Sequence, residues 1–181
     1  MRKGILLWFL AILFILTGVC RAGQYWLSES EAYWWYWDDN PDYQVMIPSR
    51  VEGRTYNSIN IFGVRSLDLT LRPNGPVIRI STINQVQGGY AAVRDGVIKR
   101  WQPAAAFKVT SDSVITTRQG IRANFFVATG KTGTGESAMI RGVVYTKGNS
   151  VVVLELLCNE KDYADETKTQ WIEVVNTFNW R

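Results

Sequence analysis

The sequence predicts an α+β protein in which helices pack on an antiparallel β-sheet. Short β-rich runs separated by Gly, Asn and Pro turns predict the sheet, and two segments with a 3.6-residue apolar period predict the helices. The clearest hairpin joins 137–146 to 150–158 through Lys147-Gly148-Asn149, where Gly and Asn favour positive φ angles. Its second strand is apolar on both faces, which predicts a central position in the sheet.

The other elements follow from the same patterns. Further strands are expected at Tyr43–Ile47, Ser58–Val64, Leu67–Leu71, Val77–Ile83, Phe107–Thr110, Val114–Thr117 and Ile121–Ala128. One helix is expected over 86–101, with an apolar face formed by Val86, Tyr90, Val93, Val97 and Trp101. A second is expected over 163–178, with a face formed by Tyr163, Thr167, Trp171, Val174, Val175 and Phe178.

The first 22 residues have the order of a secretory signal. Arg2 and Lys3 precede an apolar run over 5–19, which ends at the small-residue site Cys20-Arg21-Ala22. Cleavage after Ala22 is the preferred interpretation. Lipidation of Cys20 is one alternative, although Val19 stands where bacterial lipoproteins have Gly, Ala or Ser. Retention as an anchor is the other, although residues 4–20 give only ~25 Å of helix against a ~30 Å membrane core.

Composition excludes several classes of function. Removing Arg2, Lys3 and Arg21 with the signal lowers the net charge from +4 to +1, so no nucleic-acid partner is expected. The chain has no histidine, which excludes Ser-His-Asp and Cys-His catalysis and zinc sites that need histidine. Cys158 would be the only thiol after cleavage, and its place at the end of an apolar run predicts a buried structural role.

Two loops contain fragments of ligand-binding motifs. Gly130-Lys131-Thr132 is similar to part of a P-loop, but Phe125 occupies the place of its first glycine, so a flexible hairpin loop is preferred. The run 38–42 begins like a calcium loop, but Tyr43 and Ser49 replace the required Gly and Glu, so a capped turn is preferred to a looser calcium site. No metal, cofactor or catalytic residue is expected.

The order of several segments resembles the Mog1/PsbP-like superfamily. These are Tyr43-Gln-Val-Met-Ile-Pro48, the run 116–123, the hairpin 138–158 and a closing helix that ends in Val174-Val-Asn-Thr-Phe-Asn-Trp180. The resemblance implies an α-β-α sandwich and a non-catalytic function. It implies roles such as photosystem assembly in plants, Ran binding in eukaryotes and envelope lipoproteins in bacteria. The organisation expected is a signal peptide at 1–22, an aromatic N-terminal segment at 23–42 and the domain at 43–181.

The aromatic segment is the main candidate for a binding site. It contains Tyr33, Trp34, Trp35 and Trp37, and it lies outside the family pattern. On a helix, one face would carry Trp26, Ser30, Tyr33 and Trp37, whereas Trp34 and Trp35 would point away from it. One contact surface would therefore not bury every ring. The rings either close the core, contact a protein partner or a membrane surface, or stack on carbohydrate.

The sequence therefore favours an exported, non-catalytic binding, assembly or accessory protein of the bacterial cell envelope or periplasm. Its expected partner is an envelope protein, with a membrane surface as a further option. A carbohydrate-binding module is one alternative, and it needs a row of exposed, coplanar rings. A small carboxylate-dependent hydrolase is another, and it needs two acids facing one cleft.

We expect the mature protein to begin at Gly23 without a lipid, because the segment before it has the order of a cleavable signal. Mass spectrometry of the protein recovered from its native host measures this directly. Retention of Met1 would contradict cleavage, and a lipid mass on Cys20 would support the lipoprotein alternative.

Overall fold

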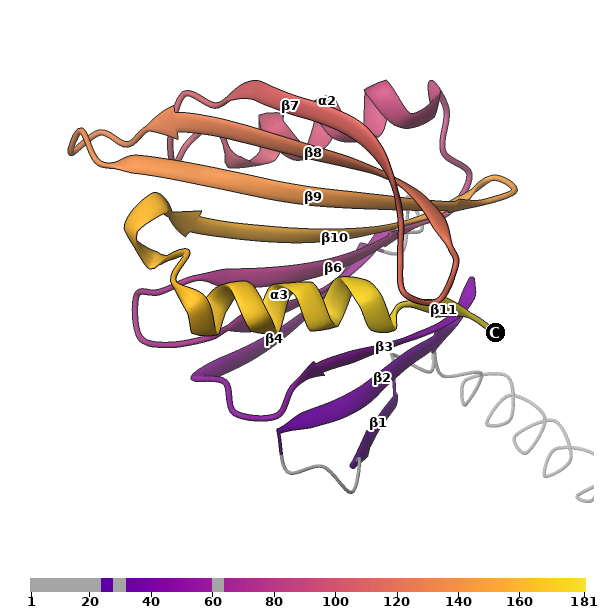
Figure 1. Ribbon diagram of the computed structural model, residues 1–181. Coiled ribbons are helices and arrows are strands. Elements are labelled where there is room, and N and C mark those ends of the chain that lie inside the picture. Colours follow the sequence, from indigo (N-terminus) through magenta and orange to yellow (C-terminus); the bar gives the residue numbers. More distant parts are fainter. Residues whose placement is uncertain (1–23, 28–31, 60–63) are drawn as a thin grey trace, which may run out of the picture.

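The computed structural model of the protein describes residues 24–27, 32–59 and 64–181 (Figure 1). The predicted signal segment, with Cys20, lies outside these ranges. No helix in the described part of the chain combines the length and the apolar character that crossing a membrane requires.

Seven strands form the larger sheet, in the spatial order β4-β5-β6-β10-β9-β8-β7. They are β4 (Gly53–Ile59), β5 (Val64–Thr70), β6 (Val77–Ile83), β7 (Lys108–Thr116), β8 (Arg122–Lys131), β9 (Ser137–Lys147) and β10 (Ser150–Asn159). Each neighbouring pair is antiparallel. The hairpin β9–β10 confirms the clearest prediction, and β10 lies between β6 and β9 as its two apolar faces required.

A smaller sheet has the order β1-β2-β3-β11. Its strands are β1 (Gln24–Leu27), β2 (Tyr33–Asp39), β3 (Asp42–Pro48) and β11 (Asn179–Trp180). The aromatic segment thus supplies β2, which pairs along its whole length with β3. The last residues of the chain add to the other edge of β3, where Asn179 pairs with Gln44.

The helices cover opposite faces of the larger sheet (Figure 1). They are α2 (Gly89–Trp101) and α3 (Asp165–Thr177), and the short 3-10 helix η2 (Glu160–Asp162) follows β10. Alternate residues of β10 belong to two buried clusters. Val153 packs with Val97 of α2, whereas Leu154 packs with Trp171 of α3 and with the smaller sheet. This arrangement is the α+β fold with helices on both sides that the sequence predicted.

Three local predictions were wrong. The range Ser58–Val64 is not one strand, because β4 ends at Ile59 and pairs antiparallel with β5 from Val64. The two strands expected over 107–117 are the single edge strand β7, which accommodates a bulge between Val109 and Ser111. The helical face considered for the aromatic segment does not form, because β3 offers β2 a hydrogen-bonding partner and aromatic side chains favour strands.

A stack of aromatic rings joins the layers at the end of α3. The ring of Phe178 lies 3.8 Å from that of Tyr145 on β9 and 5.5 Å from that of Tyr43 on β3, measured between centroids. Trp180 packs edge-on against Phe178 at 5.0 Å. The Tyr145 hydroxyl also donates a 2.9 Å hydrogen bond to the carbonyl oxygen of Val175 on α3. Phe178 is completely buried, so the larger sheet, α3 and the smaller sheet share this one contact.

Replacing Phe178 by Ala should lower the free energy of unfolding by about 3–5 kcal/mol, because it leaves a cavity where three layers meet. Urea denaturation followed by far-UV circular dichroism measures the change. Ile172→Ala is the matched control, since Ile172 lies on the same helix with 40% of its surface exposed. Equal losses in the two variants would contradict the role assigned to the stack.

Candidate functional site

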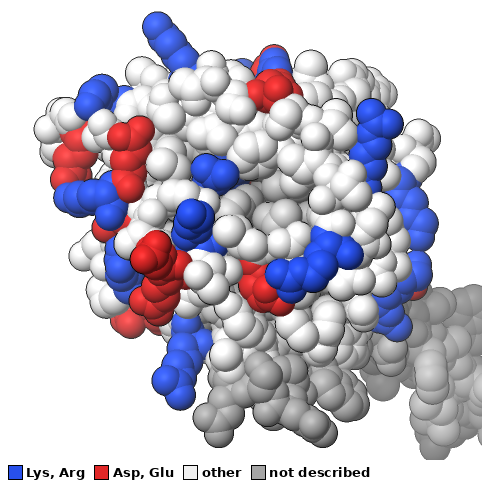
Figure 2. Space-filling model, in the orientation of Figure 1, with Lys and Arg blue, Asp and Glu red and all other residues white. Residues whose placement is uncertain are grey.

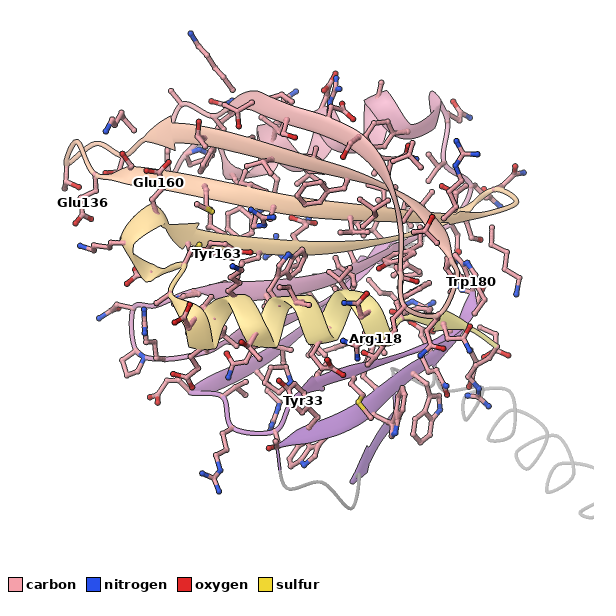
Figure 3. The ribbon with its side chains drawn as sticks, in the orientation of Figure 1. Tyr33, Arg118, Glu136, Glu160, Tyr163 and Trp180 are labelled. Carbon is pink, nitrogen blue, oxygen red and sulfur yellow. The ribbon has the colours of Figure 1, made fainter. Side chains whose placement is uncertain are left out.

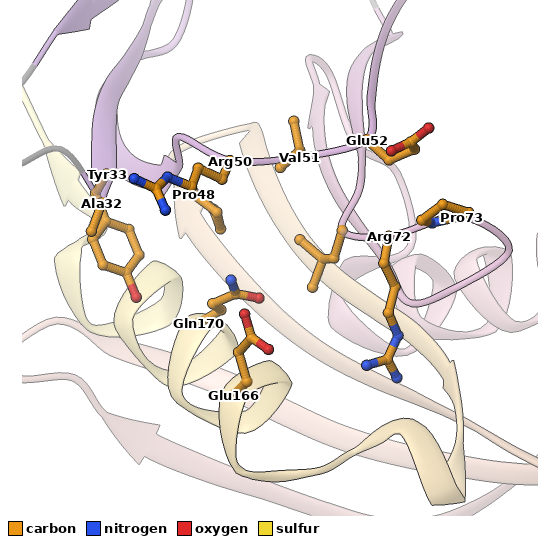
Figure 4. A pocket seen from close by; sticks show the side chains of 11 residues that line it. Ala32, Tyr33, Pro48, Arg50, Val51, Glu52, Arg72, Pro73, Glu166 and Gln170 are labelled. Atoms are coloured by element: carbon orange, nitrogen blue, oxygen red, sulfur yellow. The ribbon is translucent and has the colours of Figure 1, made fainter.

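A hollow lies where the smaller sheet meets the start of α3. We call it the groove. It has a volume of about 900 Å³ and is lined by Ala32, Tyr33, Pro48, Arg50, Val51, Glu52, Leu71, Arg72, Pro73, Glu166 and Gln170 (Figure 4). Four separate parts of the chain form its walls: the start of β2, the β3–β4 connection, the β5–β6 turn and the first turns of α3.

Backbone hydrogen bonds hold the loop walls of the groove. The amide of Ser49 donates to the carbonyl of Ala32 at 3.0 Å, which ties the end of β3 to the start of β2. The amide of Glu52 donates a hydrogen bond to the carbonyl of Thr70 at 2.8 Å. The amide of Leu71 donates one to the carbonyl of Pro76 at 2.9 Å. These contacts join the loop walls of the groove to the neighbouring strands.

Charges of both signs surround the groove. Arg50 and Arg72 lie on the loop walls, and Glu166 lies in the first turn of α3, where a carboxylate is favoured by the helix dipole. Arg72 is oriented by a 2.8 Å ion pair with Asp162. Basic and acidic side chains also alternate over the face that carries α3 (Figure 2). The groove is therefore suited to a ligand with both polar and apolar groups.

Two carboxylates line the groove without converging on one point. In Figure 4, Glu166 points into the hollow beside Gln170, whereas the carboxylate of Glu52 points away from Glu166. A carboxylate-dependent hydrolase needs both acids on one cleft at a defined separation. The groove does not offer that pair. Within the described residues, no group of three or more Cys, Asp or Glu side chains is placed to hold a metal ion.

All four predicted site residues lie on β2, but the structure divides them. Trp34 packs against the core, and the guanidinium of Arg54 lies 4.1 Å from the centre of its ring. Tyr33, Trp35 and Trp37 alternate with it on the other face, where Trp35 is opposite Met46 and Trp37 is opposite Gln44 on β3. All four are half-buried.

Of these residues only Tyr33 lines the groove, and it extends toward α3 (Figures 3 and 4). Partial burial raises the pKa of its phenol, and the nearby Glu173 carboxylate raises that pKa further. The prediction missed Arg50, Arg72, Glu166 and Gln170. They are exposed or half-buried polar residues far apart in the sequence, and no motif connects them.

Cys158 has the structural role that the sequence predicted. It is 5% exposed and belongs to the core between the larger sheet and α3. Burial raises the pKa of its thiol to about 12. At neutral pH the group is therefore protonated, and it is a poor nucleophile.

Comparison with solved structures identifies the fold. The solution structure of CyanoP, the cyanobacterial PsbP of Synechocystis sp. PCC 6803, matches with a TM-score of 0.54 at 12% sequence identity. That match covers 91% of this chain and 95% of CyanoP. The protein has a Mog1/PsbP-like fold.

Two further structures match with lower scores. A Mog1 mutant matches with a TM-score of 0.46 at 9% identity, over 88% of this chain and 96% of Mog1. LpqN of Mycobacterium tuberculosis, described as involved in cell envelope biogenesis, matches with a TM-score of 0.39 at 15% identity, over 74% of this chain and 79% of LpqN. No protein-family model and no curated protein sequence matches the chain.

Trp34 and Trp35 lie on opposite faces of β2, so replacing each by Ala should change the free energy of unfolding by different amounts. Trp34→Ala should lower the free energy of unfolding by about 2–4 kcal/mol, because the ring packs against the core. Trp35→Ala should cost less than about 1 kcal/mol, because Trp35 lies on the face of β2 opposite to Trp34, where its cross-strand partners are Trp26 on β1 and Met46 on β3. Urea denaturation of both variants measures the difference. A larger loss for Trp35→Ala would reverse the assignment of faces on β2.

Proposed function

We propose that this protein is an exported accessory protein of the bacterial cell envelope that binds a protein partner through the groove. The observation that carries the proposal is the groove itself, a hollow of about 900 Å³ with Arg50, Arg72 and Glu166 at its walls. Alternating charge of this kind favours a polar protein surface over an apolar ligand. The secretory signal predicted at 1–22 supports the envelope location.

Three features support binding without catalysis. The chain has no histidine to act as a general base. Burial raises the pKa of the Cys158 thiol to about 12, so it is a poor nucleophile. Glu52 and Glu166 point in different directions at the groove, so they do not form the acid pair of a glycosidase.

The two alternatives for the aromatic segment have less support. A carbohydrate-binding module needs exposed rings in one plane, whereas Trp35 and Trp37 are half-buried and Trp34 packs against the core. A membrane-surface contact needs a continuous exposed apolar patch. The large apolar side chains that are exposed in the described residues, Val109, Val114 and Ile172, belong to β7 and α3 rather than to β2.

Site-specific photocrosslinking in the native host tests the proposal. A photoreactive amino acid at Gln170, in the groove, should give an adduct with one envelope protein. The same amino acid at Lys99 should give none, because Lys99 is exposed on α2, which covers the opposite face of the larger sheet. Recovery of the same adducts from both positions, or of none from Gln170, would contradict the proposal.

Charge reversal at the groove should weaken the same adduct. Arg50→Glu combined with Arg72→Glu should reduce its yield by about tenfold, because the partner loses two attractive charges and meets two repulsive ones. Lys99→Glu is the matched control and should leave the yield unchanged. An unchanged yield in the Arg50 and Arg72 variant would show that the partner binds elsewhere.

A further inference from the structure

A second cavity lies on the other side of α3 from the groove. We call it the α3 pocket. It has a volume of about 290 Å³ and lies between α3 and the strands β7, β8 and β9. The groove is lined from α3 by Glu166 and Gln170, whereas the α3 pocket is lined by Lys168, Trp171 and Val175. The two sites therefore occupy different faces of one helix.

The body of the α3 pocket is apolar. Phe125 and Val143 line it from the larger sheet, and Trp171 and Val175 line it from α3. Ile172 stands at its rim with 40% of its surface exposed. The face that carries α3 is hollowed near its centre, beside basic side chains (Figure 2). Such a cavity removes the apolar part of a small ligand from water, which is the main source of its affinity.

Arg141 gives the α3 pocket an unusual polar group. Its guanidinium lies between two rings, with the centre of Phe125 at 5.1 Å and that of Tyr163 at 4.8 Å. Its Nε is buried without a hydrogen-bond partner, and no carboxylate in the described residues forms an ion pair with it. The rings hold the planar group in one orientation while contributing no negative charge.

A second positive charge stands at the same cavity. Lys168 lines the α3 pocket and is exposed, and it forms no ion pair with a carboxylate of the described residues. The acids nearby are engaged elsewhere, since Glu173 pairs with Arg118 at 3.4 Å and Asp162 pairs with Arg72 at 2.8 Å. The α3 pocket thus combines an apolar body with two cations that form no ion pair with an acid of the described residues.

We propose that the α3 pocket binds a small amphiphilic carboxylate, with the carboxylate at Arg141 and Lys168 and the apolar body between Trp171 and Val143. Arg is the side chain best matched to a carboxylate, because its planar fork donates two parallel hydrogen bonds. A neutral apolar ligand would leave the guanidinium without a hydrogen-bond acceptor, and a small hydrophilic anion would leave the apolar walls unused. The site is independent of the proposed partner groove.

Calorimetric titration with three probes tests this proposal on the protein as purified from the cell. Decanoate carries both the charge and the apolar chain, decanol lacks the charge, and acetate lacks the chain. Decanoate below its micellar concentration should bind saturably at one site, and each of the others at least about tenfold more weakly. Equal affinity for decanol and decanoate, or no saturable binding of decanoate, would overturn the proposal.

Variants locate the binding. Arg141→Met keeps the length of the side chain and should weaken decanoate binding by about tenfold or more, whereas Lys99→Gln on α2 should have no effect. A second pair of variants, Ile172→Glu and Ile172→Gln, tests the same site if Arg141→Met fails to fold. Ile172 is exposed at the rim, so both replacements should leave the fold intact. The Glu variant should bind decanoate about tenfold more weakly than the Gln variant. Equal binding by these two variants would overturn the proposal.

Discussion

The ring stack around Phe178 is the contact on which the rest of the structure depends. Phe178 meets Tyr145 of the larger sheet and Tyr43 of the smaller sheet, and its own position at the end of α3 fixes that helix between them. Both the groove and the α3 pocket use α3 as one wall, so their shapes follow from where this residue holds the helix. A fully buried ring with partners in both sheets tolerates little displacement, because protein interiors are close-packed.

Buried polar groups complete the assembly at two other places. Glu155 is fully buried on β10, and it accepts hydrogen bonds from Arg100 at 2.9 Å and from the Trp101 indole at 2.8 Å, which fix the end of α2 on the sheet. Asp38 on β2 pairs with Arg65 on β5 at 2.9 Å, which links the two sheets. Burial raises the pKa of Asp38 above its usual range, and the Arg65 charge opposes that rise. Such pairs favour the observed arrangement, because separating the partners would leave a buried charge unpaired.

The position of α3 gives the protein two chemically different surfaces. On the side of the smaller sheet, the helix presents Glu166 and Gln170 to a groove with charges of both signs. On the side of β8 and β9, it presents Trp171 and Val175 to an apolar cavity with two cations. Both sites therefore depend on where the fold holds this one helix.

The sequence by itself determined the fold class, the central β9–β10 hairpin, both helices and the buried state of Cys158. These features depend on local periodicity and turn chemistry, which the chain carries residue by residue. The candidate sites were decided only by tertiary structure. The sequence drew attention to the rings at 33–37, yet the structure assigned Trp34 to the core and brought only Tyr33 to the groove. The groove brings together Arg72 and Glu166, and the α3 pocket brings together Arg141 and Lys168. The members of each pair are far apart in the chain. They line the same cavity only because strand pairing and the Phe178 stack bring α3 onto the sheet.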